Sequence, residues 1–421
     1  MRILIVNPYA VGPDDAGITR PYNFAKALRR LGHDPVVLTS SFDHFSQRFD
    51  RLDGWHRVRR EEVNGVPFVW MRTLRYRGND WKRAANMVGF GASILNPEVL
   101  RETGRPDVVM GSSPHILAAG GAFALARRLG VPHVMEVRDP WPQILVDAGQ
   151  YSESHPAIRT FRRLERMLYR RSESVVSVYP FLSKYLVANG CRQDRITWVP
   201  NGIDNEFLPE VRPPEASSPP TTTFLYAGSH GLANGLELLL EVADRIRTDT
   251  ELASVTIRLM GDGPRKPGLR AEAQRRGLTQ LVFSDPVPKR EVYAAMQTAD
   301  AFLQVLIDSP VFAYGPSPNK LVDYMVSARP TLFVSNSPFN PVRDAKAGFT
   351  ADPSRPETLI EAMRLVVRMS REDRWAMGLR GRAHIVEHFD LDVLAHRLGK
   401  VFEAAVARRP APEPRGLGAA A

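Results

Sequence analysis

The sequence predicts an α/β protein built from two Rossmann-like domains, each with a doubly wound parallel sheet, that face a cleft. Three observations support this prediction. The chain of 421 residues is longer than one ordinary hydrophobic core requires, which favours two domains. Short apolar runs alternate with helical patterns, as in parallel α/β sheets. A segment rich in proline, serine and threonine, 208–222, then interrupts the alternation and is typical of a linker.

The first predicted domain, 1–207, begins with the apolar run RILIV, which we interpret as a buried strand rather than a signal peptide. The helical pattern that follows ends at Gly32, a residue type common at helix C-termini. The strands expected in this domain are 2–8, 34–40, 66–72, 107–113, 132–139 and 174–179.

The second predicted domain, 223–386, repeats the same alternation. Helices at about 387–409 are expected to pack back on the first domain. Residues 410–421, PAPEPRGLGAAA, have almost nothing to bury and are expected to form a disordered tail. The strands expected in the second domain are 223–228, 255–261, 281–287, 301–306 and 331–336.

The composition bears on compartment and partners. A single cysteine, Cys191, allows no intramolecular disulfide and fits a reducing cytoplasm. No run approaches the roughly 18 apolar residues of a spanning helix. The net charge of +10 would suit nucleic acid, anionic lipid or a phosphorylated substrate. Since no zinc-finger or RNA-binding signature accompanies that charge, no nucleic-acid partner is expected.

A glycine and several polar residues follow the strands of the first domain, at the edge where open α/β sheets bind ligands. They are Gly17 and Arg20 after the first strand, His115 after the fourth, and Arg138 and Asp139 after the fifth. The alternative interpretations are a loop that caps the next helix, a structural histidine and a structural Arg–Asp pair. The first loop lacks the G-x-G-x-x-G spacing, which disfavours a nicotinamide enzyme.

Four polar or glycine-rich loops follow strands of the second domain. Three glycines in YAGSHGLANG (226–235) lie between a strand and a helix, an arrangement in which backbone amides hold phosphates. The other loops contain GDGP (261–264), DPVP (285–288) and SPNKL (317–321). Each is weak evidence alone, because turns need glycine anyway. Together they predict a pocket for a ligand with phosphates, a sugar and a base, and the scattered histidines predict no metal site.

With these loops assembled, the sequence resembles the nucleotide-sugar glycosyltransferases of the two-Rossmann-domain type (the GT-B fold), specifically the retaining family 4. The resemblance covers nearly the whole chain, and its most specific stretches are VPNGID (199–204) and SPNKLVDYMVSARPTL (317–332). The SPNKL and VRDPWP segments look most like the bacterial aminosugar transferases of O-antigen and capsule synthesis.

The resemblance implies a role for each loop. Gly17 would approach the phosphates and sugar of the donor, while Gly228 and Ser229 would neighbour its diphosphate. The loop 285–288 would contact the base through its backbone. Asp323 matches the second acid of the family's E-x7-E motif, which usually holds the ribose hydroxyls.

The sequence also departs from the family pattern. The first acid of E-x7-E falls on Gly315, and Ser229 and Asn234 replace the usual arginine and lysine of the glycine-rich loop. Two cations that commonly neutralise the leaving diphosphate are therefore missing. Lys320 is the local substitute that we expect, with Arg20 or Arg138 contributing across the cleft.

These considerations define the predicted site. The catalytic candidates are Lys320, Asp139, which would orient the acceptor hydroxyl or the donor sugar, and His115. No metal or other cofactor is expected. The residues expected to bind the donor are Gly17, Arg20, Arg138, Gly228, Ser229, Asn234, Gly261, Gly263, Pro286, Val287, Ser317, Asn319, Lys320, Leu321 and Asp323.

The expected reaction moves a hexose or N-acetylhexosamine from a UDP-linked donor to an acceptor hydroxyl with retention, in surface polysaccharide synthesis on a lipid carrier. The alternatives are transfer to a soluble small molecule, such as an antibiotic precursor, and a non-catalytic sugar-nucleotide-binding module. Segment 55–83 interleaves basic residues with Trp55, Trp70, Tyr76 and Trp81, which suits an anionic membrane surface. We therefore expect a cytoplasmic protein that contacts the inner face of the cell membrane.

Overall fold

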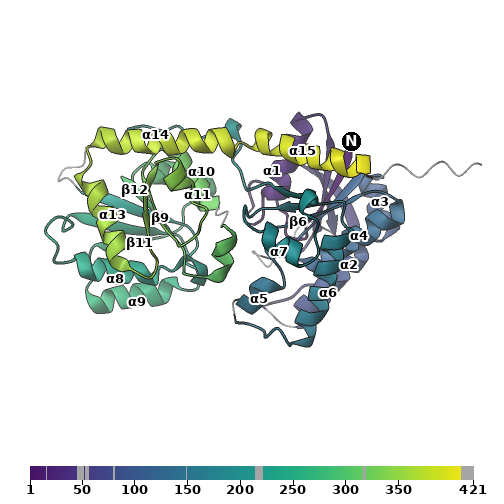
Figure 1. Cartoon of the computed structure of the whole chain (residues 1–421), viewed down its shortest axis with the longest axis horizontal. Coiled ribbons are helices and arrows are strands. Elements are labelled where there is room, and N and C mark those ends of the chain that lie inside the picture. Colours follow the sequence, from purple (N-terminus) through teal and green to yellow (C-terminus); the bar gives the residue numbers. More distant parts are fainter. Residues whose placement is uncertain are drawn as a thin grey trace, which may run out of the picture. The chain divides into compact units, whose positions relative to one another are not determined.

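The computed structural model describes residues 1–15, 17–44, 52, 56–78, 81–147, 149–213, 221–315 and 319–408. It divides the chain into two compact units (Figure 1). The first comprises residues 1–200 and the described residues from 391 onward, and the second comprises residues 201–390. The predicted class of two Rossmann-like α/β domains is confirmed.

The sheet of the first unit has the order β3-β4-β2-β1-β5-β6-β7-β8, and every neighbouring pair is parallel except β3 and β4. The chain order reverses between β1 and β5, so the loops after these strands flank the position where doubly wound folds bind ligands. The strands are β1 (Arg2–Val6), β2 (Asp34–Ser40), β3 (Val58–Val63), β4 (Val66–Met71), β5 (Val108–Ser112), β6 (His133–Val137), β7 (Ser174–Ser177) and β8 (Ile196–Trp198).

Helices cover both faces of this sheet. One face packs against α1 and α15, and the other against α2, α3 and α4. The helix that returns to the first unit is α15, whereas α14 belongs to the second. The helices of the first unit are α1 (Arg20–Arg30), α2 (Trp81–Ser93), α3 (Pro97–Thr103), α4 (Ile116–Leu129), α5 (Gln143–Asp147), α6 (Pro156–Arg171), α7 (Ser183–Ala188), the short η1 (Gln193–Arg195) and α15 (Leu391–Arg408).

The second unit contains an entirely parallel sheet of order β11-β10-β9-β12-β13-β14, with its reversal between β9 and β12. Its central strands β9, β12 and β13 are mostly buried, as expected where helices cover both faces. The strands are β9 (Thr222–Ala227), β10 (Val255–Met260), β11 (Leu281–Ser284), β12 (Ala301–Val305), β13 (Thr331–Val334) and β14 (Gly348–Ala351).

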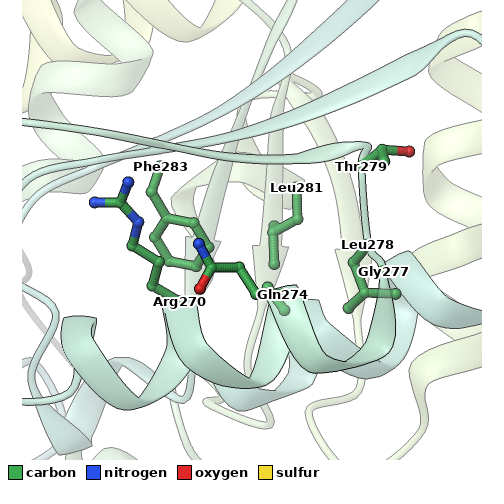
Figure 2. A pocket seen from close by; sticks show the side chains of 8 residues that line it. Arg270, Gln274, Gly277, Leu278, Thr279, Leu281 and Phe283 are labelled. Atoms are coloured by element: carbon green, nitrogen blue, oxygen red, sulfur yellow. The ribbon is translucent and has the colours of Figure 1, made fainter.

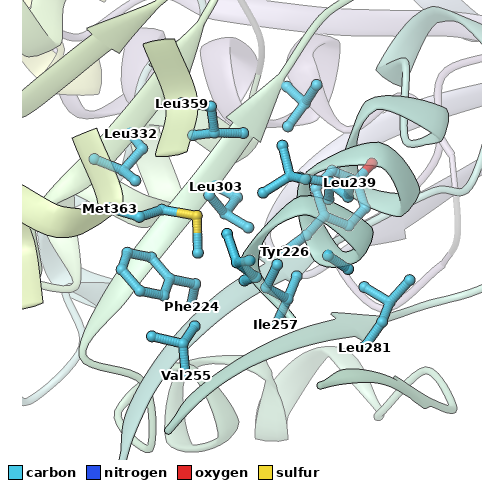
Figure 3. Packing of buried hydrophobic residues seen from close by; sticks show 14 of the residues in the cluster. Phe224, Tyr226, Leu239, Val255, Ile257, Leu281, Leu303, Leu332, Leu359 and Met363 are labelled. Atoms are coloured by element: carbon cyan, nitrogen blue, oxygen red, sulfur yellow. The ribbon is translucent and has the colours of Figure 1, made fainter. Parts of the chain in front are cut away.

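Figure 3 shows the larger core of this unit, where Phe224 and Ile257 of the sheet meet Leu239 and Met363 of the covering helices. A smaller core on the opposite face contains Tyr324. The helices are η2 (Asn205–Phe207), η3 (Leu232–Asn234), α8 (Glu237–Ile246), α9 (Lys266–Arg276), α10 (Lys289–Met296), η4 (Pro310–Tyr314), α11 (Asn319–Val326), α12 (Pro341–Asp344), α13 (Pro356–Arg368) and α14 (Arg371–His388).

Residues 201–207, which the sequence assigned to the first domain, belong to the second unit. The amide of Ile203 donates to the carbonyl of Phe389, and Arg382 donates to the carbonyl of Pro209, so this segment is tied to α14. Residues 214–220 of the predicted linker and the predicted disordered tail, 410–421, lie outside the described residues.

The segment expected to face a membrane is partly core. Trp70 on β4 and Tyr76 after it are 3% and 4% exposed, so they cannot reach a membrane surface as the sequence suggested. Trp81, at the start of α2, is 72% exposed. Trp55 lies outside the described residues.

Candidate functional site

Lys320 joins the first turn of α11 to the glycine-rich loop that follows β9. Its ammonium donates to Tyr226 Oη at 2.7 Å and to Asn234 Oδ1 at 2.5 Å, and it lies 4.6 Å from the centroid of the Tyr226 ring. Burial lowers the pKa of Lys320 to about 8. By the resemblance, Asn234 stands where the family usually has lysine. The ammonium of Lys320 lies next to this position and brings a positive charge from α11.

Gly228 gives Lys320 room. With φ of +153°, a Cβ at this position would lie 2.4 Å from Lys320 Cδ. Asn234 Nδ2 and Tyr226 Oη both donate to the carbonyl of Ser229, at 2.8 and 2.6 Å, which fixes the loop around the ammonium. The loop and the lysine therefore form one preorganised group.

A second loop, after β10, packs directly on the first. The amide of Gly228 donates to the carbonyl of Met260, and a Cβ at Gly261, whose φ is +140°, would lie 2.0 Å from the carbonyl oxygen of Gly228. Gly263 is equally constrained, since a Cβ there would meet the backbone of His230 at 2.7 Å. Glycine is thus required for close packing of two backbones, as well as for turn geometry.

Lys266, at the start of α9, ties the loop after β10 to the loop after β11. Its ammonium donates to the carbonyls of Gly261 and Ser284, at 2.8 and 3.1 Å, and to Asp285 Oδ1 at 2.9 Å. The sequence gave no signal for this role, because the contacts join residues up to 19 positions apart. In the adjoining segment Pro286 is exposed and Val287 half-buried.

Asp323 lies one turn beyond Lys320 on α11. Its Oδ1 accepts a hydrogen bond of 2.8 Å from Tyr293 Oη on α10, and the carboxylate is half-buried. Burial and the charge of Asp323 raise the pKa of Tyr293, so the phenol remains a donor. Asn319 is exposed at the start of the helix, while Leu321 is buried in the domain. Ser317 lies outside the described residues.

Gly315, where the family's first acid would stand, has φ of +84°. A side chain would be strained in this left-handed conformation. No carboxylate is supplied at this position, and the backbone geometry explains why glycine occupies it.

Buried polar atoms near this strand edge have no partner among the described residues. They include both ring nitrogens of His230, the hydroxyl of Ser284 and the side-chain amide of Gln304. His230 is 0% exposed, and burial lowers the pKa of its ring. Unsatisfied buried polar groups are rare and call for an explanation, and a ligand or ordered water would supply the missing hydrogen bonds. The sequence indicated the loop but not these three residues.

In the first unit, Asp139 and Arg138 follow β6 as predicted, and Ser113 holds their backbone. Ser113 Oγ accepts from the amides of Arg138 and Asp139, at 3.0 and 3.2 Å, and donates to the carbonyl of Asp139 at 2.8 Å. Tyr179 Oη donates to Asp139 Oδ1 at 3.0 Å. Nε and Nη1 of Arg138 are buried without a hydrogen-bond partner in the described part of the chain. The positive charge of Arg138 also acts on the buried Glu136, whose pKa it helps to lower.

His115 is the N-cap of α4. Its Nδ1 accepts from the amide of Ala118 at 3.0 Å, its side chain is 1% exposed, and burial lowers its pKa to about 4. This cap matches the structural alternative, although Nε2 is buried with no partner among the described residues. Because Nδ1 accepts this hydrogen bond, the neutral ring carries its proton on Nε2, which can donate one hydrogen bond, and the ring has no charge near neutral pH.

The structure surrounds Arg20 with internal partners, which disfavours the expected contact with the donor. Arg20 is 6% exposed, pairs with Glu136 at 2.9 Å, and donates to the carbonyls of Val199 and Pro200. Glu136 also accepts from Ser112 at 2.7 Å. These partners are buried within the first unit, so the guanidinium helps to hold that unit together. Gly17 is exposed in the same loop.

A cavity of about 390 Å³ lies elsewhere on the second unit, between α9 and β11 (Figure 2). It is lined by Arg270, Ala273, Gln274, Gly277, Leu278, Thr279, Leu281 and Phe283. The cavity shares no residue with the predicted donor loops, so it is distinct from the predicted donor site.

Within the described residues, no cluster of three or more histidine, cysteine or acidic side chains is arranged to hold a metal ion. In the same part of the chain, no helix has the length and apolar character needed to cross a membrane.

The two units match two family models. The Glycosyl transferase 4-like domain matches residues 17–202, and the Glycosyl transferases group 1 domain matches residues 221–368. The chain is 23% identical over 269 residues to a putative colanic acid biosynthesis glycosyl transferase, WcaI, of Escherichia coli K12, which covers 61% of this chain and 64% of the relative. It is 26% identical over 151 residues to O-antigen chain mannosyltransferase C of Escherichia coli, covering 33% and 35%. The chain thus spans less than two thirds of the length of these relatives.

Solved structures give the same fold. Sucrose-phosphate synthase of Thermosynechococcus elongatus superposes with a TM-score of 0.69 at 14% identity, over 97% of this chain and 99% of that one. The Anabaena protein Alr3699/HepE, in complex with UDP and glucose, superposes with a TM-score of 0.65 at 15% identity, over 96% and 100%. These structures show that the fold is GT-B. The two family matches together cover most of the chain, and the chain therefore belongs to the glycosyltransferases that combine a 4-like domain with a group 1 domain.

Proposed function

We propose that this protein transfers a hexose or N-acetylhexosamine from a UDP-linked donor to an acceptor hydroxyl, with retention of anomeric configuration, in the synthesis of a bacterial surface polysaccharide. The observation that carries the proposal is Lys320, whose ammonium lies against the glycine-rich loop and donates to Asn234 and to the hydroxyl of Tyr226. The names of the colanic acid and O-antigen relatives support the polysaccharide, and the UDP complex of the Anabaena structure supports the nucleotide.

The chemistry follows from where charge develops. As the bond between sugar C1 and the diphosphate oxygen breaks, negative charge grows on the departing UDP, and preorganised donors aimed at that charge lower the barrier. Lys320 and the amides of the loop beginning at Gly228 would supply these donors. Asp323 would accept bonds from the ribose hydroxyls. No metal is needed in this scheme, so turnover is expected to persist in EDTA.

The first unit would handle the acceptor. Asp139 would accept a hydrogen bond from the acceptor hydroxyl and so fix the orientation of that group. The new C1–oxygen bond forms as the old one breaks, and the acceptor's proton leaves with the departing diphosphate. Arg138, with two buried nitrogens lacking partners in the described residues, would add positive charge on this side.

A donor panel tests the activity. Purified protein incubated with UDP-, GDP- and dTDP-linked sugars and no acceptor is expected to release UDP slowly from a UDP-sugar, with water as the acceptor. Nucleotide release is measured in a coupled assay, with and without EDTA. Release from a GDP- or dTDP-sugar instead would change the assigned donor. No release from any member, despite a ligand-induced rise in unfolding temperature, would favour the non-catalytic binding module.

We further propose that the acceptor is lipid-linked and that α2 contacts the inner face of the cell membrane. Trp81 and Val88 lie two turns apart on α2 and are 72% and 59% exposed, and Leu74 just before the helix is 53% exposed. Arg77 and Lys82, in the same segment of the sequence, are exposed as well. Apolar anchors flanked by cations suit an anionic bilayer surface.

The expected result is co-sedimentation with phosphatidylglycerol-containing liposomes at low salt, reduced in high salt and reduced in Trp81→Ser/Val88→Ser. The matched control is Val187→Ser, which removes a 42% exposed apolar side chain from α7 of the same unit. Binding that is equally weak in all variants would instead favour a soluble acceptor.

A further inference from the structure

The fold brings two side chains together at the ends of neighbouring strands. β6 and β7 are parallel, and Val137 is paired with Ser177 at their last shared position. Asp139 and Tyr179 each lie two residues beyond that pair. Because the strands are in register, the two side chains leave the sheet edge side by side, and Tyr179 Oη donates to Asp139 Oδ1 at 3.0 Å.

Local hydrogen bonds hold both partners from behind. The amide of Tyr179 donates to Ser177 Oγ at 3.1 Å, and that hydroxyl donates to the carbonyl of Tyr179 at 2.7 Å. Ser113 accepts from the amide of Asp139 and donates to its carbonyl. The backbones at 139 and 179 are therefore fixed independently, so the tyrosine–carboxylate bond orients one side chain against a rigid frame.

The bond leaves the two carboxylate oxygens inequivalent. Oδ1 of Asp139 accepts from Tyr179, whereas no described residue donates to Oδ2. Burial, followed by the charge of Asp139, raises the pKa of Tyr179 well above its ordinary value, so the phenol stays a donor throughout the physiological range. A neutral donor of this kind fixes the rotation of the carboxylate without removing its charge.

We propose that Tyr179 is a positioning residue that holds Asp139 by Oδ1 and so presents Oδ2 to the acceptor hydroxyl. The inference rests on the role proposed above for Asp139. A carboxylate free to rotate would spend less time in the reactive geometry, and a misplacement of about 1 Å can cost up to 100-fold in rate. Tyr179 therefore acts on turnover through Asp139 and not on donor binding.

The test is a double-mutant cycle on hydrolysis of UDP-glucose, with UDP-N-acetylglucosamine used if it is turned over faster. Tyr179→Phe is expected to lower kcat by roughly 10- to 100-fold with the donor KM within about 2-fold of wild type. Asp139→Asn is expected to lower kcat at least as far. Tyr179→Phe should cause no further loss in the Asp139→Asn background, because the residues act as one unit.

Tyr185→Phe is the matched control. Tyr185 Oη also donates to a carboxylate in the first unit, Glu165 Oε1 at 2.7 Å, but this pair is not part of the proposed site. The control should lower the unfolding temperature while leaving kcat nearly unchanged in folded protein. Ser113→Ala, which releases Asp139 from the opposite side, is a second variant should Tyr179→Phe fold poorly, and its loss in kcat should likewise vanish in the Asp139→Asn background.

The outcomes separate the two proposals. Wild-type hydrolysis by Asp139→Asn would overturn the role of Asp139 and the inference with it. A strong loss in Asp139→Asn, with unchanged kcat in Tyr179→Phe, would overturn the positioning role alone. An undiminished effect of Tyr179→Phe in the Asp139→Asn background would also overturn it, because Tyr179 would then act by another route.

Discussion

Replacement of Lys320 by methionine is expected to lower kcat/KM for the UDP-sugar by about 10²- to 10³-fold, the usual cost of removing one preorganised donor to developing negative charge. Methionine keeps much of the length and burial of the lysine, so the loop formed around Gly228 is expected to survive. Steady-state kinetics with the best donor of the panel measure the effect. Lys400→Met, at an exposed position on α15, is the matched control, and equal kcat/KM values for the two variants would exclude the role of Lys320.

Lys320 is also expected to determine how kcat/KM depends on pH. In the free protein, burial lowers the pKa of Lys320 to about 8. The side chain is therefore charged at pH 6–7 and loses its positive charge as the pH rises through 8. A diphosphate binds the charged form and raises the pKa again. Thus kcat/KM should fall above about pH 8 while kcat persists to higher pH. In the Lys320→Met variant, kcat/KM should not show this fall. A kcat/KM profile that stays flat to pH 10 in the wild type would contradict the assignment.

Replacement of Arg20 by methionine is expected to destabilise the first unit by about 3–5 kcal/mol, because it leaves Glu136 buried without its ion-pair partner. The guanidinium of Arg20 helps to hold the pKa of Glu136 below its ordinary range against the opposing effect of burial. The loss is a large part of the roughly 5–15 kcal/mol that stabilises a folded domain. Urea unfolding followed by circular dichroism measures it.

Arg30→Met on the same helix is the control. Arg30 pairs with Asp392 on the surface, where such pairs contribute about 0–1 kcal/mol, so this variant should unfold almost as the wild type does. Donor KM should be unchanged in the Arg20→Met protein that remains folded. Normal stability together with a raised donor KM would restore the sequence-based interpretation of Arg20 as a ligand contact.

The central strands could be predicted because each is a buried apolar run between helices, but three edge strands could not. β3 carries the sequence VRREEV and pairs only with β4, so it lies at the sheet edge and needs no apolar face. The dipeptide Asn64-Gly65 does indicate a hairpin between β3 and β4. Both residues have positive φ, as a tight hairpin turn requires. β8 and β14 are edge strands of three and four residues, too short for any periodicity.

The loops of the site were predictable from strand order, but their interactions were not. Lys320 meets Asn234 across 86 residues and Tyr226 across 94, and Tyr179 meets Asp139 across 40. Local sequence patterns carry no information about contacts between residues so far apart in the sequence. Arg20 illustrates the reverse problem, since a cation in a ligand-binding loop looks the same in sequence whether it faces a substrate or a buried carboxylate.

The return of α15 to the first unit has a consequence for how the chain matures during translation. Leu394, Leu398 and Phe402 of this helix complete the same core as Phe24 and Leu28 of α1. The second unit is one continuous stretch, 201–390, and has all its residues before α15 leaves the ribosome. The domain made first is therefore expected to finish folding last, with the apolar face of α1 uncovered until then and exposed to chaperones.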